Sequence, residues 1–313
     1  MKKLIAMLLA LVMVLSLAAC GSSEPAATEA PAADAPAATE AAAVDYSTMT
    51  IDELKPLIKT INEGKLTMVT SPDFAPYEFY ALDEAGTPSL AGFDIALGQY
   101  IADFLGLELE VIPMDFDGTI TELGMGNADI GMAGYSPDPK RENAMSFSEV
   151  YYTGGQSFVC HKDNASKFTS LADTNKAEYQ IGAQIGSIQA GLAKENSGNA
   201  DIVELSKVTD ILAEIIGNKL DGAYIETVVA ENYAKKYPEL CVVLEVPYDA
   251  EGSVVGVNKD NGALLAAVNL AIKEALSDGS MAQFIADAND ASSVEGFTYE
   301  GLLDDEGKVP DAE

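Results

Sequence analysis

Hydrophobic residues follow different spacings along the chain, and each spacing predicts a different element. The run from Leu4 to Leu17 is apolar and uncharged. A bilayer-spanning helix needs roughly 20 apolar residues, so this shorter run predicts a leader segment. Apolar residues recur at helical intervals from Ile95 to Leu105 and alternate from Leu107 to Ile112. With the strand-like run from Leu66 to Val69, these segments predict a β-α-β unit.

The alternation of strands and helices continues beyond this unit. Thr119 and Glu122 have the spacing of a helix cap, the run 129–133 is strand-like, and further alternations follow Gln156. Phe116, flanked by aspartates and a glycine, is expected in a loop. This order predicts an α/β fold with mostly parallel sheets and helices on both faces. The chain is long for a single core, so we expect two lobes.

The N-terminal segment carries the signals of export and processing. Lys2 and Lys3 precede the apolar run, and small residues lead to Cys20 and Gly21. This order is typical of a signal peptide, and its end resembles the bacterial lipobox. We therefore expect residues 1–19 to be removed and Cys20 to be acylated, as by palmitate, on the extracytoplasmic face of the membrane. Ordinary cleavage with loss of the cysteine is the alternative.

Composition narrows the choice of partners. Residues 20–48 are expected to form a lipid-anchored flexible linker, because they are rich in alanine, proline and acidic residues. The whole chain has 50 acidic and 18 basic residues, a formal net charge of −32. This charge excludes nucleic acid as a partner and disfavours peripheral binding to anionic lipid. The acyl chains would therefore hold the protein at the membrane.

Two cysteines and one histidine lie in the folded part. Cys160 and Cys241 each fall in an apolar, strand-like run. After export they could form a disulfide, but we favour a pair of buried free thiols. His161 is expected to be exposed at a strand end. The histidine and cysteines are not clustered, so we expect neither a metal site nor a cofactor.

Several short motifs, in order and spacing, resemble a known family. They are Phe74-Ala75-Pro76-Tyr77-Glu78-Phe79, Ala91-Gly92-Phe93-Asp94, Pro113-Met114-Asp115-Phe116, Ala133-Gly134-Tyr135-Ser136 with Arg141, Phe147-Ser148, Gly186-Ser187 and Asp221-Gly222-Ala223. Over about residues 62–288 the chain resembles the polar amino-acid-binding proteins of ABC importers, bacterial extracellular solute-binding protein family 3. Patterned relatives include glutamine- and lysine/arginine/ornithine-binding proteins.

The resemblance implies a type II periplasmic-binding-protein-like fold that closes on a small amino acid and delivers it to an ABC permease. We expect a monomer whose hinges lie near Tyr151 to Gly155 and near Glu251 to Val255. The implied divisions are lobe 1 at 60–150 and 256–290, lobe 2 at 156–250, and a C-terminal tail at 291–313.

A zwitterionic ligand needs paired donors for its carboxylate. Arg141 offers fixed parallel N–H groups, and Ser136 adds a hydroxyl and an amide. The resemblance implies that both bind the ligand α-carboxylate, with Gly134 in the same motif. Gly186 and Ser187 precede a predicted helix, whose N-terminus also favours a carboxylate. The alternatives are a surface arginine paired with a neighbouring acid and an ordinary serine N-cap.

Other implied ligand residues address the rest of the amino acid. Glu226 stands where the family usually has an aspartate that receives the ammonium, although it could be a solvated acid. Phe74 and Phe116 match aromatics that sandwich the ligand's aliphatic part, and core packing is the alternative. Ser71 replaces an aspartate of several cation- or amide-binding relatives, which slightly favours a neutral amino acid.

Two other functions stay open. Cyclohexadienyl dehydratases resemble this family and use a glutamate as an acid, so Glu226 raises the possibility of an enzyme. No histidine, nucleophile elbow or metal set accompanies Glu226 in the sequence, and binding is therefore the favoured interpretation. A ligand-binding sensor is the other alternative, although no signalling domain is recognisable.

Overall fold

The computed structural model describes residues 44–82, 86–249 and 252–293 of the chain. The predicted signal peptide, Cys20 and most of the predicted linker precede these residues, and most of the predicted tail follows them. Those predictions therefore lie outside the described residues. Within the described ranges no helix is both long and apolar enough to cross a bilayer.

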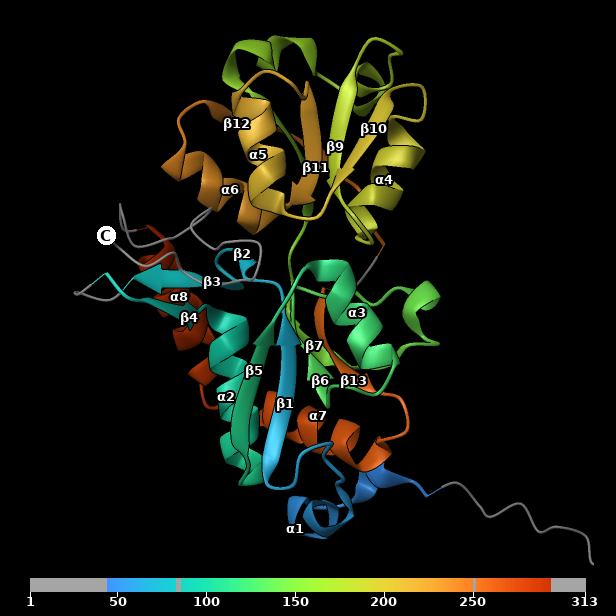
Figure 1. The fold of residues 1–313 in the computed structure, drawn as a ribbon, viewed down its shortest axis with the longest axis vertical. Coiled ribbons are helices and arrows are strands. Elements are labelled where there is room, and N and C mark those ends of the chain that lie inside the picture. Colours follow the sequence, from blue (N-terminus) through green and yellow to red (C-terminus); the bar gives the residue numbers. More distant parts are fainter. Residues whose placement is uncertain (1–43, 83–85, 250–251, 294–313) are drawn as a thin grey trace, which may run out of the picture. The chain divides into compact units, whose positions relative to one another are not determined.

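Lobe 1 is built on a five-stranded sheet with the order β5-β1-β6-β13-β7 (Figure 1). Strand β1 pairs in parallel with β5 and β6, whereas β13 pairs antiparallel with β6 and β7. The last strand in the sequence thus lies inside the sheet that the first strand began. The strands are β1 Lys65–Thr70, β5 Glu108–Pro113, β6 Ile130–Gly131, β7 Met145–Tyr152 and β13 Ser253–Asn258.

The helices of lobe 1 bury apolar faces against this sheet and against each other. Buried side chains of α2, such as Leu97 and Ile101, share one core with Leu264 and Val268 of α7. The helical segments are η1 Tyr46–Thr48, α1 Ile51–Leu54, η2 Lys55–Leu57, α2 Phe93–Leu105, α3 Phe116–Gly124, η3 Pro139–Arg141, α7 Gly262–Ser277 and α8 Ser280–Ser293.

Lobe 2 repeats the plan with the sheet order β10-β9-β11-β8-β12. Strand β9 is parallel to β10 and β11, and β8 is antiparallel to β11 and β12. The strands are β8 Gln156–His161, β9 Gln180–Gln184, β10 Asp201–Leu205, β11 Gly222–Glu226 and β12 Leu240–Val246. The helices are η4 Lys162–Lys167, η5 Leu171–Thr174, α4 Ile188–Asn196, α5 Val208–Ile216 and α6 Thr227–Lys236. The predicted two-lobed α/β fold is confirmed, but the sheets are mixed, since each five-stranded sheet has two parallel and two antiparallel strand pairs.

A third, three-stranded antiparallel sheet was not predicted. It consists of β2 Asp73–Phe74, β3 Glu78–Leu82 and β4 Pro88–Ala91 in that order. Tyr77 closes the turn between β2 and β3, and its N–H donates to the Phe74 carbonyl at 2.9 Å. The small sheet places Asp73, Phe74 and Glu78 next to the end of β1.

Three local predictions were wrong. Helix α3 begins at Phe116 with Asp115 in the N-cap position, so Phe116 is helical, and Thr119 lies within the helix. The Thr119 hydroxyl donates to the Phe116 carbonyl at 2.5 Å, as a helical threonine often does. His161 is buried and not exposed, because β8 lies between β11 and β12 inside the lobe 2 sheet.

The two cysteines face each other across β8 and β12. Cys160 and Cys241 are register partners in the antiparallel pair, and both are free thiols in the structure. Burial raises the pKa of the Cys160 thiol to about 12, which keeps it protonated. Both thiols are unpaired, as the favoured interpretation predicts, but only Cys160 is buried and Cys241 is half-buried.

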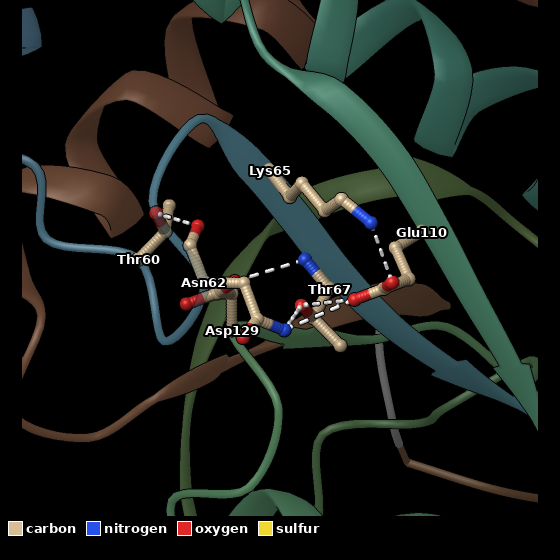
Figure 2. A network of polar contacts seen from close by, with 6 residues as sticks. All are labelled: Thr60, Asn62, Lys65, Thr67, Glu110 and Asp129. Carbon is tan, nitrogen blue, oxygen red and sulfur yellow. Dashed lines mark hydrogen bonds and ion pairs between the residues drawn. The ribbon is translucent and has the colours of Figure 1, made fainter.

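A polar network secures the start of β1, at the end of the strand away from Ser71 (Figure 2). Lys65 Nζ lies 2.8 Å from Glu110 Oε1, and Asn62 Nδ2 donates to Glu110 Oε2 at 3.0 Å. The Thr67 N–H donates to Asp129 Oδ2 at 2.8 Å. These contacts fix the loop before β1 to β5 and to the loop before β6, which is a structural role.

Candidate functional site

The guanidinium of Arg141 is buried between aromatic rings and backbone carbonyls. Nη1 donates to the Ser136 carbonyl at 3.3 Å, and Nη2 donates to the Gly186 carbonyl of lobe 2 at 3.0 Å. Its Cζ lies 5.3 Å from the ring centroid of Phe116 and 5.8 Å from that of Tyr135. The residue is only 7% exposed, so the alternative of a surface arginine is wrong.

Arg141 has no carboxylate within ion-pair distance among residues 44–82, 86–249 and 252–293. Burial lowers the pKa of Arg141, because desolvation disfavours the charged form. A guanidinium nevertheless stays charged in proteins. A buried cation without an anion is unfavourable, so this position is prepared to receive a negatively charged group.

A cavity of about 1000 Å³ opens beside Arg141. Its walls include Asp117 of α3 and both predicted residues of the β9–α4 loop, Gly186 and Ser187. Ser187 is the N-cap of α4: its Oγ accepts from the Ala190 N–H at 3.2 Å and donates to the Gln184 carbonyl at 2.7 Å. The helix predicted after this loop is confirmed, and the simple N-cap interpretation of Ser187 also holds.

The predicted residues near β6 form one contacting group with Arg141. Gly134 has φ +56°, and a Cβ there would lie 2.7 Å from the ring of Phe74, so glycine is required. Phe116 meets the Tyr135 ring edge to face, with centroids 5.7 Å apart. Phe74, Phe116, Gly134, Ser136 and Arg141 are thus brought together, although their contact with a ligand stays a prediction.

Ser71 precedes Phe74 by three residues, and its hydroxyl already has a protein partner. It donates to Asp73 Oδ1 at 2.7 Å. Asp73 Oδ2 accepts from Gln184 Nε2 at 3.2 Å and from the Val208 N–H at 2.6 Å, both in lobe 2. Burial raises the pKa of Asp73 to about 6. Sequence reasoning missed Asp73. The only signal in the sequence was its position two residues after Ser71.

Glu226 is buried at the start of α6, so the alternative of a solvated acid is wrong. Its Oε2 accepts from the Val229 N–H at 3.0 Å, and its Oε1 accepts from the Tyr77 hydroxyl at 3.4 Å. Burial raises the pKa of Glu226 to about 7. Among the described residues that line the Arg141 cavity, Glu226 is not found. Tyr77 also contacts Phe74, with ring centroids 5.3 Å apart, but neither of these rings lines the cavity.

Sequence reasoning also missed Asp94, which contacts the Gly134 turn. Asp94 Oδ2 accepts from the Gly134 N–H at 3.1 Å, and Oδ1 accepts from the Tyr151 hydroxyl at 2.7 Å. The Gly134 amide is therefore not free for a ligand, which leaves Gly134 a shaping role in this structure. In the described part of the chain, no group of three or more His, Cys, Asp or Glu could hold a metal ion.

The chain is similar in sequence and in structure to known proteins. Residues 66–287 match the bacterial extracellular solute-binding proteins, family 3. The arginine-binding extracellular protein ArtP of Bacillus subtilis (strain 168) is 34% identical over 221 residues, covering 69% of this chain and 83% of that protein. The amino acid ABC transporter substrate-binding protein AbpA of Streptococcus pneumoniae, solved with bound L-arginine, has a TM-score of 0.71 and 31% identity, covering 74% of this chain and 98% of that chain. Cyclohexadienyl dehydratase of Pseudomonas aeruginosa is 25% identical over 194 residues, covering 62% of this chain and 71% of the enzyme.

Proposed function

Since the chain belongs to the bacterial extracellular solute-binding proteins of family 3, we propose that it binds an amino acid between its lobes and delivers it to an ABC importer. The observation that carries this proposal is Arg141. Its buried guanidinium has no carboxylate partner in the described ranges and borders a cavity of about 1000 Å³. The α-carboxylate of an amino acid supplies the planar pair of acceptors that a guanidinium binds best.

The other site residues contact different parts of the ligand. Arg141 and Ser136 bind the α-carboxylate from lobe 1, while the N-terminal end of α4 at Gly186 and Ser187 approaches it from lobe 2. Phe74 and Phe116 pack against the aliphatic part of the ligand. Glu226 receives the ammonium, because a carboxylate with a raised pKa gains its charge when a cation arrives.

Arginine is the first ligand to test. ArtP is an arginine-binding protein and AbpA was solved with L-arginine, and the net charge of −32 attracts a cation. Ser71 alone argues for a neutral side chain, but the buried carboxylate of Asp73 lies only 2.7 Å from the Ser71 hydroxyl. The local charge that Ser71 lacks is therefore restored by its neighbour.

We further propose that the mature protein is a monomer held at the outer face of the membrane by acyl chains on Cys20. This proposal rests on the lipobox-like order of residues before Cys20 and on the alanine-rich segment after it. The lobes divide near 60–150 with 256–290 and near 156–250, so that the two connections between them act as hinges.

A dehydratase-like enzyme is the second candidate, and Glu226 is the observation that favours it. A pKa of about 7 suits a general acid at neutral pH. The same property suits an ammonium partner, and the relatives of higher identity are binding proteins. Incubation with prephenate or arogenate, followed by product analysis, separates the two, because a binding protein returns the substrate unchanged.

A thermal-shift screen against the twenty amino acids tests the proposed function directly. A ligand selective for the folded state adds RT ln(1 + [L]/Kd), about 4 kcal/mol at a 1,000-fold excess over Kd. We expect arginine to raise the melting temperature, and its decarboxylated amine to leave the temperature unchanged. If no amino acid stabilises the protein, the proposal is wrong.

A further inference from the structure

Glu78 is a fully buried carboxyl group without a hydrogen-bond donor. It lies on β3 with 0% exposure, and neither of its carboxyl oxygens has a donor among the described residues. Its near neighbour is another acid: the Asp94 N–H donates to the Tyr77 carbonyl at 2.9 Å, which places Asp94 beside Glu78. Two acids therefore meet in an interior where neither is paired with a lysine or arginine in the described ranges.

The hydrogen bonds decide which acid holds the proton. Asp94 already accepts from the Gly134 N–H and from the Tyr151 hydroxyl, so its carboxylate form is stabilised. Glu78 accepts nothing and can make a hydrogen bond only by donating one. Burial and the neighbouring Asp94 raise the pKa of Glu78 well above its ordinary value. Two adjacent carboxyl groups cannot both ionise at low cost.

We propose that Glu78 is a positioning residue of the ligand site, which as a neutral acid donates a hydrogen bond to Asp94 and fixes its carboxylate. This inference rests on the proposed function. Asp94 in turn holds the Gly134 turn, and that turn leads directly to Ser136, whose carbonyl accepts from Arg141. Asp94 also holds Tyr151, at the end of β7 where the chain leaves lobe 1. The shared proton therefore supports the carboxylate-binding loop and one proposed hinge together.

Among the residues that the structure describes, those that influence the pKa of Glu78 include no cation. Asp94 and Asp73 act on it as negative charges. The hydroxyls of Tyr135 and Tyr151 are also near enough to sense a charge on Glu78, and both are neutral at physiological pH. Ionisation of Glu78 would add a like charge to an acidic interior, so the neutral form is stable.

Infrared spectroscopy of the unliganded protein tests the proton on Glu78 without any ligand. At about pH 8, exposed acids are ionised. Asp73 and Asp94, each with a pKa of about 6, and Glu226, with a pKa of about 7, are also mostly ionised. We expect a carbonyl stretch from a protonated carboxylic acid, lost in Glu78→Gln and kept in the control Glu63→Gln, an exposed acid. Absence of this band, or its survival in Glu78→Gln, overturns the proposal.

Two variants test positioning by titration calorimetry and by amide exchange at Gly134. Glu78→Met keeps the volume but cannot donate, so we expect arginine affinity to fall about tenfold and the Gly134 amide to exchange faster. Glu78→Gln donates from its amide, so it should rescue both readouts. Equal behaviour of the two variants would refute the proposal. Gly134 exchange needs no ligand, so if wild-type protein binds no amino acid, the proposed function fails while this inference is still decided by exchange and by the infrared band.

Discussion

At Arg141, burial and function act in opposite directions. The residue is held without an ion-pair partner in the described ranges, at a cost to the folded state that a ligand carboxylate would offset. Such a residue is better explained by binding than by stability. Its aromatic contacts with Phe116 and Tyr135 hold the guanidinium in place before the ligand arrives.

Arg141→Ala should weaken amino-acid binding strongly. Truncating one side of a desolvated charge pair costs about 2 to 5 kcal/mol, so the dissociation constant should rise about 30-fold or more. Titration calorimetry with arginine measures the change, and Lys59→Ala, which removes an exposed cation, is the matched control. Unchanged affinity in Arg141→Ala would show that the carboxylate binds elsewhere.

Glu226 should link ligand binding to pH. Its pKa is about 7 in the unliganded protein, raised from 4.5 mainly by burial, so its contribution to stability is present below about 4.5 and lost as the pH rises through about 7. An ammonium beside Glu226 stabilises the charged form, and binding near pH 7 should release protons. Calorimetry in buffers of different ionisation enthalpy measures this release, which Glu226→Gln should abolish. Equal proton release in the variant would remove Glu226 from the site.

The sequence identified neighbouring residues only where a short motif contained them, and their contact with a ligand stays a prediction. Arg141, Ser136 and Phe116 come from local motifs, and the structure brings them together. Asp73 contacts a backbone N–H 135 residues away in the sequence. The proposed role of Glu78 depends on Asp94, so it joins strand β3 to helix α2. Such roles depend on tertiary neighbours, which local spacing does not encode.

Among the elements, α5 is capped from outside its own segment. Its N-cap residue, Lys207, offers no side-chain cap, and the first helical N–H, that of Val208, donates to Asp73 of lobe 1 at 2.6 Å. A capping carboxylate also complements the helix dipole. One side chain therefore satisfies a helix end and joins the lobes.

Asp73→Ala should destabilise the protein by about 0.5 to 2 kcal/mol, the usual range for loss of a helix cap. It should also weaken arginine binding, since the contact joins the lobes. Urea denaturation with and without arginine measures both effects. Glu63→Ala, which removes an exposed acid, should change neither. A neutral effect of Asp73→Ala on both readouts would mean that water replaces the cap.

Elements with a long, regular pattern were predictable, and short ones were not. Helix α2 was expected at 95–105 and extends from Phe93 to Leu105. The start of α3 was misplaced because Asp115, and not Thr119, occupies the N-cap position. The β2-β3-β4 sheet was missed because β2 has only two residues. Two residues are too few to show an alternation of apolar and polar side chains.

For the whole molecule, two connections join lobes that share several hydrogen bonds. One connection contains Gly154, where an added Cβ would clash with Glu226 Oε1, and the other contains Gly252 with φ +130°. The backbone conformation of Gly252 favours glycine, whereas a Cβ at Gly154 would require the end of the Glu226 side chain to shift. Hinge motion at these two connections stays a prediction.

Solution scattering should show closure when an amino acid binds. We expect the radius of gyration to fall on adding saturating arginine, because the ligand favours the conformation in which both lobes contact it. Arg141→Ala at the same arginine concentration should show a smaller change. Identical curves for wild type with and without a bound ligand would argue against hinge closure.

Strand β13 also determines the order in which the lobes can be completed during synthesis. It enters lobe 1 between β6 and β7, yet every strand of lobe 2 precedes it in the chain. A nascent chain that ends at Val246 would have all strands of lobe 2 but a lobe 1 sheet with two unpaired edges, which are prone to wrong pairing. Limited proteolysis of that truncated chain should spare 156–246 and cleave within 65–152. The half of the protein that is made first is thus finished last, and until β13 arrives the facing edges of β6 and β7 lack their partner strand.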